Sequence, residues 1–163
     1  MAQEHGTEDQ QTAAKAADLF GEYRFKVDSK GRVAVPAEFR KVLTEDLVVS
    51  RELTDKCLYV FEPETFNQWV EGLFEDKFGG FKSSDRRHVA LRTKLKSRAQ
   101  RAEVDSSGRV MLNQQARDAA GIEKDVVVVG NTGYFEVWDA KAFDEELGSI
   151  DLGFFYDEPE DAN

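Results

Sequence analysis

The sequence is poor in the residues that many enzyme and metal sites require. It has one cysteine and two histidines among 163 residues. Cys57 cannot form an intramolecular disulfide, and its place in the apolar run 57–61 predicts a buried structural thiol. His5 and His88 are too few and too far apart to supply a metal-ligand set or a histidine-based triad. With no glycine-rich phosphate loop, the sequence predicts a protein that is not an enzyme and that uses no metal, cofactor or small-molecule substrate.

Long apolar runs are also missing. None approaches the roughly 20 residues that a bilayer-spanning helix needs, so no membrane partner is predicted. The N-terminal segment MAQEHGTEDQQ is acidic and polar, the opposite of a secretory signal. Together with the single cysteine, this favours a reducing cytoplasm as the location.

Charge is distributed unevenly along the chain. The formal net charge is −10, but residues 1–19 carry −3 and residues 144–163 carry −8, which leaves +1 for residues 20–143. Within that body, residues 82–101 carry +7. Because partner choice follows where charges lie rather than their total, the acidic balance does not exclude a nucleic-acid partner.

A short motif occurs twice in the chain. The segment Val27–Val33, VDSKGRV, recurs as Val104–Val110, VDSSGRV, with six of seven positions identical and an offset of 77 residues. The same offset pairs further residues, namely Arg40 with Arg117, Val60 with Val137 and Phe66 with Phe143. The chain therefore contains one unit twice, and each unit presents the same Asp/Gly/Arg turn.

Each copy of the motif is predicted to form a strand, a tight turn and a second strand. In the first copy apolar residues alternate with polar ones over residues 23–28, and the alternation continues at Val33 and Val35. The Asp-Ser-x-Gly-Arg segment between them supplies an Asx-type turn former and a glycine that can take positive φ.

Helical and strand patterns follow both turns. Pro36 fits the first turn of a helix with Phe39, Val42 and Leu43 on one face, and Asn113 stands at the equivalent position as a predicted N-cap. Short strands are predicted at 47–50, 56–61, 125–130 and 134–138, a long helix after 63, and a basic helix that begins at Ser83 or Ser84. The predicted fold class is α+β.

Three groups of residues resemble the MraZ family of bacterial transcriptional regulators. They are Gly21-Glu22-Tyr23, Asp28–Arg32 with Pro36–Arg40, and Asp105–Arg109 with the run 119–130. The resemblance covers about residues 20–147. It implies two tandem AbrB-like swapped-hairpin β-barrel modules with flanking helices in one chain, and protomers joined into homo-oligomeric rings. It also implies binding to repeated double-stranded promoter DNA of a cell-division and cell-wall gene cluster, and hence association with the nucleoid.

Composition and periodicity, together with the resemblance, predict a division of the chain into five parts. Residues 1–18 are predicted to be a disordered acidic tail with a short helix at 12–17, and ordered structure to begin near Phe20. Residues 20–78 would form the first module with its C-terminal helix, 79–96 a basic linker helix, 97–147 the second module and 148–163 a disordered acidic tail. This chain departs from the family in its long N-terminal extension, in Asn113 in place of proline, and in the basic character of residues 92–101.

The family's Asp-x-x-x-Arg motif maps onto Asp28 and Arg32 and, in the second module, onto Asp105 and Arg109. A guanidinium can bind a phosphate bidentately or read guanine in the major groove, so Arg32 is the leading candidate for DNA contact. Asp28 is predicted to cap the turn and orient Arg32. The other candidate is that these Asp/Arg pairs hold the turn or a subunit interface.

Further cations extend the predicted DNA-binding surface. Lys30 lies in the first turn, and Lys26 and Arg24 lie on the outward face of the preceding strand. Arg109, with Asp105 in the orienting role, is a weaker candidate because Ser107 replaces the lysine of the first copy.

Two other roles stay open for the acidic C-terminal tail. AbrB-type folds occur in antitoxins whose acidic, aromatic tails wrap a toxin, and residues 151–163 have that composition. An antitoxin-like protein-binding module is therefore the alternative function. The tail could also compete with DNA for the basic turns.

Overall fold

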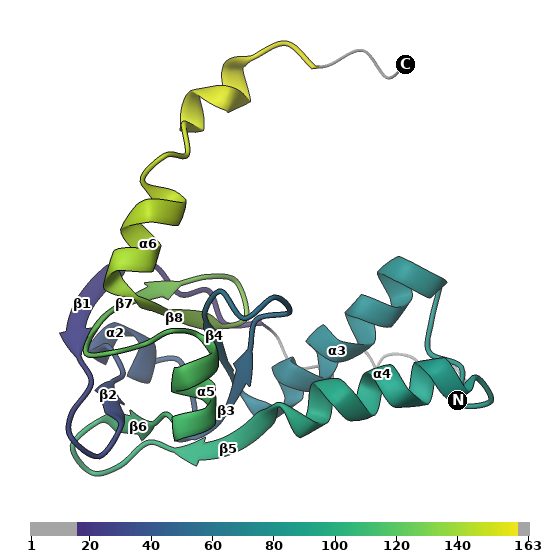
Figure 1. Ribbon diagram of the computed structural model, residues 1–163, viewed down its shortest axis with the longest axis horizontal. Helices are drawn as coiled ribbons and strands as arrows, with labels where there is room; N and C mark the ends of the chain where they lie inside the picture. The colour runs from purple at the N-terminus through teal and green to yellow at the C-terminus, as the bar shows by residue number, and fades with distance from the viewer. Residues whose placement is uncertain (1–15, 160–163) are drawn as a thin grey trace, which may run out of the picture.

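The computed structural model describes residues 16–159, and its centre is one β-sheet to which both sequence copies contribute (Figure 1). The strands are β1 (Glu22–Lys26), β2 (Arg32–Ala34), β3 (Asp46–Arg51), β4 (Leu58–Phe61), β5 (Ala99–Glu103), β6 (Arg109–Met111), β7 (Asp125–Gly130) and β8 (Phe135–Asp139). Six of them form an antiparallel sheet in the order β1-β7-β8-β4-β3-β5, and β2 pairs with β6 in a second, two-stranded sheet. The α+β class is confirmed.

The two copies exchange strands. β1 of the first copy pairs with β7 of the second, and β5 of the second copy pairs with β3 of the first. Val33 pairs with Val110 and Tyr59 with Glu136, so at both places a residue faces the residue 77 positions later. Where two antiparallel strands pair a residue with its own repeat equivalent, a two-fold axis passes between them, so the copies are related by a pseudo-two-fold axis between β2 and β6 and between β4 and β8.

One hydrophobic core serves both copies. Its buried members include Val33, Phe39 and Leu58 from the first copy and Val110 and Phe135 from the second. The ranges 20–78 and 97–147 therefore mark two sequence copies that share a core, because strand exchange places each copy's side chains in the other's interior. The two strands that flank each turn pair with the other copy rather than with each other.

Two short helices sit at equivalent positions after the turns, α2 (Ala37–Arg40) and α5 (Gln114–Ala119). Pro36 is the N-cap of α2 rather than part of its first turn, and Asn113 is the N-cap of α5, where its Oδ1 accepts from the backbone N–H of Ala116 at 2.7 Å. The predicted apolar face of the first helix is wrong at Val42, which is 55% exposed because α2 ends two residues earlier.

The remaining helices are α3 (Pro63–Phe78), α4 (Arg86–Ser97) and α6 (Ala140–Leu147), and η1 (Leu152–Tyr156) is a 3-10 helix. Helices α3 and α4 form an antiparallel arm that projects from one side of the sheet (Figure 1). The basic helix begins at Arg86, later than expected from its sequence, because Asp85 rather than Ser83 or Ser84 caps it, with Oδ1 accepting from Arg87 N at 2.9 Å. The predicted linker helix 79–96 thus starts seven residues late, after a turn at Gly79 with φ of 77°.

Both ends of the described chain differ from the sequence prediction. Ordered structure begins before Phe20: Asp18 forms an isolated bridge with Thr132, and Leu19 is buried against Gly130, where no side chain would fit. Most of the short helix predicted at 12–17 lies outside the described residues. Toward the C-terminus, residues 152–156 form η1 within the range predicted to be disordered, because Asp151 caps that turn.

Candidate functional site

Each Asp/Gly/Arg turn is closed by its own aspartate. Asp28 Oδ1 accepts from the backbone N–H of Lys30 and of Arg32, both at 2.9 Å. Asp105 Oδ1 does the same for Ser107 and Arg109, again at 2.9 Å. These donors favour the ionised carboxylate, so hydrogen bonding from the backbone N–H of the arginine lowers the pKa of both Asp28 and Asp105. The predicted turn-closing role of aspartate matches this geometry.

The pseudo-two-fold axis brings the two turns together into one ion-pair cluster. Arg32 Nε lies 2.8 Å from Asp28 Oδ2, and Arg109 Nη1 reaches the same oxygen at 3.0 Å from the other copy. Asp105 Oδ2 is more distant, 3.8 Å from Arg32 Nη1 and 4.0 Å from Arg109 Nε. The β2–β6 pairing produces this arrangement, since it places both arginines next to the axis. Asp28 is thus the shared acceptor of the cluster.

This cluster bears directly on the predicted role of Arg32. Its side chain is 29% exposed and that of Arg109 is 34% exposed, so both guanidiniums are half-buried and oriented by carboxylates. The contacts are those expected if the Asp/Arg pairs hold the turns together. They also fix the direction of each guanidinium, which is what a pre-organised phosphate or base reader needs.

Two further arginines, which were not among the predicted site residues, pack against the turns. A Cβ on Gly31 would lie 2.8 Å from Arg117 Nη2, and a Cβ on Gly108 would lie 2.8 Å from Arg40 Cζ, so each guanidinium covers the other copy's glycine. Both glycines have positive φ, 85° and 76°. The signal was present in the sequence, because Arg40 and Arg117 are themselves 77 residues apart.

Each of these arginines is anchored at the end of a strand. Arg40 Nε donates to Val35 O at 3.1 Å and Arg117 Nε to Leu112 O at 3.0 Å. Neither has a carboxylate within ion-pair distance among residues 16–159, and Lys30, exposed in the first turn, has none there either. The turns therefore carry three cations whose charge is not neutralised by a described neighbour.

The predicted basic face of β1 is largely neutralised. Arg24 makes a bidentate contact with Asp144 of α6, at 2.7 and 3.2 Å, which raises the pKa of the arginine and lowers the pKa of the aspartate. Lys26 is 69% exposed and lies 3.9 Å from Asp125. These two cations lie on an outward strand face as expected, yet each meets an acidic residue from the second copy.

The helical part of the basic segment 82–101, α4, lies apart from the turns. Figure 1 shows α4 on the arm and the β1–β2 and β5–β6 turns at the opposite end of the sheet. Several of the segment's cations have partners: Arg92 stacks 3.5 Å above the Phe81 ring, Arg98 pairs with Asp55 and Arg101 with Asp46. The turns and the basic helix are therefore two surfaces.

Other site types find little support among residues 16–159. No group of three or more His, Cys, Asp or Glu residues there could hold a metal ion. Cys57 is fully buried, and burial raises the pKa of its thiol, as expected for a structural cysteine. His88 is 4% exposed and packs against Phe78, with a centroid distance of 4.3 Å. No described helix is both long enough and apolar enough to cross a membrane.

The fold and the paired turns define a class of protein: a single chain in which two copies of one β-unit exchange strands and join their Asp/Arg turns on a pseudo-two-fold axis. The chain belongs to the MraZ family, as its motifs predicted. It matches the family described as "MraZ protein, putative antitoxin-like" over residues 19–87 and 95–158, one match for each copy.

Curated relatives cover most of the chain. It is 33% identical over 136 residues to the transcriptional regulator MraZ of Caldanaerobacter subterraneus subsp. tengcongensis, and 36% identical over 136 residues to that of Natranaerobius thermophilus. Both alignments span 83% of this chain and 91% of the relative. The transcriptional regulator MraZ of Treponema denticola is 32% identical over 83% of this chain and 92% of its own length.

Proposed function

We propose that this chain is a sequence-specific DNA-binding transcriptional regulator that acts as a homo-oligomeric ring on repeated promoter sites of a cell-division and cell-wall gene cluster. The relatives named as transcriptional regulators support the general role. The exchange of β1 and β5 between the copies supports the AbrB-like swapped-hairpin relationship. A DNA partner of this kind would place the protein on the nucleoid.

The observation that carries the proposal is the cation arrangement at the paired turns. Lys30, Arg40 and Arg117 surround them without a described carboxylate partner, and Arg32 and Arg109 lie between them. DNA phosphates would supply the missing anions, and release of their counterions would make binding weaken steeply with salt. Arg24 and Lys26 would add less, because each already has an acidic neighbour.

Asp28 has an indirect role in this proposal. A carboxylate repels phosphate, so neither Asp28 nor Asp105 would touch the DNA backbone. Asp28 holds Arg32 Nε at 2.8 Å and thereby reduces the conformational freedom that the guanidinium loses on binding. Because one pair of turns offers few contacts, useful affinity would come from several subunits that engage several repeats at once.

The test is binding of promoter DNA that holds one or several repeats, measured at a series of salt concentrations. An arginine that contacts a base or a phosphate contributes about 1–3 kcal/mol to the binding free energy, so Arg32→Ala should weaken DNA binding by roughly 5- to 150-fold. Arg32→Lys keeps the charge and should recover only part of the loss. Lys56→Ala, which removes an exposed cation paired with Glu146, is the control and should change little.

Light scattering on the same samples separates DNA contact from assembly. An Arg32→Ala protein with wild-type mass and wild-type affinity would eliminate the role of Arg32. If Lys30→Ala, Arg40→Ala and Arg117→Ala also leave affinity unchanged, the paired turns are not the DNA-binding surface.

The alternative is an antitoxin-like module that binds another protein through its acidic tail. The exposed aromatic residues of η1 and the family description favour it. It predicts a defined stoichiometric partner that co-purifies with the full chain and is lost when residues 148–163 are deleted. A deletion that changes neither partner binding nor DNA binding would discard it.

A further inference from the structure

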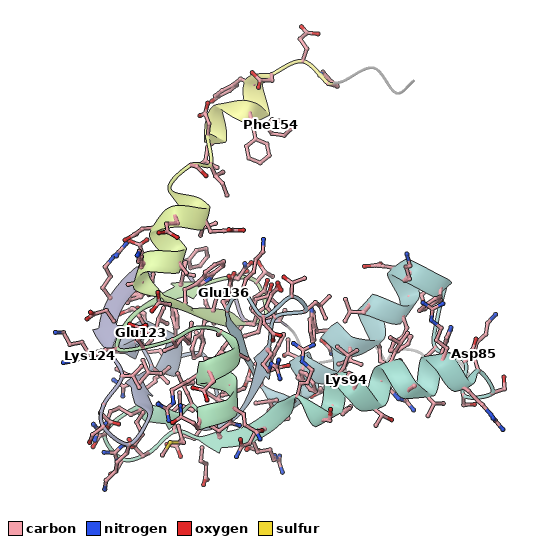
Figure 2. All side chains as sticks on the ribbon, viewed as in Figure 1. Asp85, Lys94, Glu123, Lys124, Glu136 and Phe154 are labelled. Atoms are coloured by element: carbon pink, nitrogen blue, oxygen red, sulfur yellow. The ribbon has the colours of Figure 1, made fainter. Side chains whose placement is uncertain are left out.

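The segment after α6 is folded and apolar, yet its large side chains are not packed against any other part of residues 16–159. Leu152, Phe154, Phe155 and Tyr156 are 71%, 70%, 80% and 94% exposed. Figure 2 shows Phe154 standing on η1 well clear of the sheet and the arm. Four large apolar side chains on one short turn form the kind of exposed patch that marks an interaction site.

A groove on the helical arm has complementary chemistry. It lies between α3 and α4 and has a volume of about 460 Å³. Its apolar lining includes Leu53, Leu73, Phe78, Leu91 and Leu95, and Leu53 and Leu91 are 49% and 39% exposed. We refer to it as the arm groove.

The rim of the arm groove is basic. Its charged lining residues are Lys77, Arg87, Lys94 and Arg98, with no aspartate or glutamate among the lining residues. Only Arg98 has a carboxylate partner among residues 16–159, Asp55 at 3.0 Å. Lys94, labelled on α4 in Figure 2, is exposed. An apolar floor with unpaired cations at its edge fits an aromatic segment flanked by acids.

We propose that residues 151–158 of one chain dock in the arm groove of a second copy. The aromatic side chains of η1 would fill the apolar floor, and Asp151, Asp157 and Glu158 would meet the basic rim. This assignment rests on the oligomeric part of the proposed function. It makes a head-to-tail contact, with one tail and one groove per chain, which closes into a ring when the rotation between neighbours closes.

The structure favours a second copy over the chain's own groove. Helix α6 is held against the body, since Phe143 packs on Trp138 at 5.9 Å and Lys56 pairs with Glu146. Only residues 148–151 connect α6 to η1. Figure 1 shows the tail rising above the sheet while the arm projects from its side, so η1 lies well clear of the arm. The tail of one chain is thus presented outward, where a neighbour's arm can receive it.

Cysteine trapping in the full-length protein tests this contact. Two differently tagged chains, one Leu91→Cys and one Phe155→Cys, are co-expressed and mildly oxidised, and the disulfide-linked dimer is measured on a denaturing gel. Cys57 is fully buried and stays out of the reaction. Val89→Cys is the matched control, because Val89 is 42% exposed on α4 yet does not line the groove. We expect about tenfold more linked dimer with Leu91→Cys than with Val89→Cys, which corresponds to a difference of about 1.4 kcal/mol in the free energy of forming the contact.

Equal trapping at both positions overturns the proposal. So does a Leu91→Cys/Phe155→Cys chain that forms only an intrachain disulfide, since the tail would then occupy its own groove. A tail that binds a different protein and leaves Leu91→Cys unlinked overturns it as well.

Charge reversal gives an independent measurement. Arg87→Glu with Lys94→Glu should reduce trapping of a Leu91→Cys chain, and Asp157→Lys with Glu158→Lys on the tail should restore it. Mass and DNA binding of the unsubstituted protein are measured in parallel. If no disulfide is trapped but the protein is an intact ring that binds DNA, only the docking of the tail is rejected. If the protein is a monomer that binds no DNA, the proposed function is rejected.

Discussion

The two copies of the repeat agree in backbone and differ in side chains. Both turns have an aspartate that accepts the same two backbone N–H groups and a glycine with positive φ. Yet the Asp28 carboxylate contacts the guanidiniums of Arg32 and Arg109 at 2.8 and 3.0 Å, whereas the Asp105 carboxylate comes no closer to either guanidinium than 3.8 Å. The first turn also carries Lys30 where the second has Ser107.

The difference extends to the helices. Phe39 of α2 is 1% exposed in the core, and its counterpart in α5 is Ala116. Helix α3 has 16 residues and builds the arm, while α6 has 8 and ends in the exposed tail. Strand exchange requires matching backbones, since each copy completes the other's sheet. Side chains away from the axis are free of that constraint and have taken different roles.

The largest effect should come from the core residue that only the first copy has. Phe39 contacts Tyr23 and Phe135 with centroid distances of 5.5 and 5.4 Å. Phe39→Ala should lower the free energy of unfolding by about 3–5 kcal/mol, measured by urea denaturation. Val42→Ala, at an exposed site just past α2, should cost about 0.5 kcal/mol or less. Comparable costs at the two sites would show that α2 does not anchor the core.

A smaller and symmetric effect is expected at the turn glycines. Alanine at Gly31 or Gly108 would take positive φ and press on Arg117 or Arg40, so each substitution should cost about 1–3 kcal/mol. Adding Arg117→Ala to Gly31→Ala should recover the part of the lost stability that comes from the clash with the Arg117 guanidinium. Clearly unequal costs in thermal unfolding would contradict the backbone equivalence of the two turns.

The aspartates should reveal the asymmetry through pH. Their pKa values are lowered in the folded protein, so their stabilising contribution is present above the ordinary carboxyl pKa of about 3.9 and is lost as pH falls through the folded pKa. At neutral pH, Asp28→Asn should lower the unfolding temperature more than Asp105→Asn, because Asp28 serves both arginines. Below pH 3.9 the difference between the variants should shrink. A difference that is unchanged across the pH series would exclude the ion-pair cluster as its cause.

The smallest effect concerns DNA binding and should leave stability unchanged. Lys30→Ser should decrease the salt dependence of DNA binding by about one phosphate contact per engaged subunit. Ser107→Lys, in a separate variant, should increase it by the same amount. The measurement is the slope of log affinity against log salt concentration. Equal slopes for both variants would mean that neither position lies near phosphate.

Sequence reasoning recovered the local chemistry of the site. The turn-closing aspartates, the glycines with positive φ and the Asn113 cap all follow from interactions within a few residues, which a sequence displays directly. Family membership was also predicted from the repeated motifs and is confirmed. The cap at Asp85 and the early end of α2 were missed, since several nearby residues could serve as caps and the surrounding contacts select one.

What crosses between the copies could not be predicted in this way. Arg40 covers Gly108 and Arg109 reaches Asp28 only because strands of the two copies pair with each other, β2 with β6 at the turns themselves. Arg24 meets Asp144 across 120 residues of sequence for the same reason. A surface arginine has many possible acceptors, and its own neighbours do not indicate which one the fold brings near.

The amino-acid sequence was sufficient to predict that one unit is used twice, that each copy carries an aspartate-closed turn, and that the chain is a MraZ family member. These properties depend on residue identity and short-range hydrogen bonds. Three features became visible only in the folded chain: the two turns form one surface, three of its cations have no described carboxylate partner, and an aromatic tail and a basic-rimmed groove face outward. Those properties depend on strand pairing between residues far apart in sequence, where packing and register select among many electrostatically similar partners.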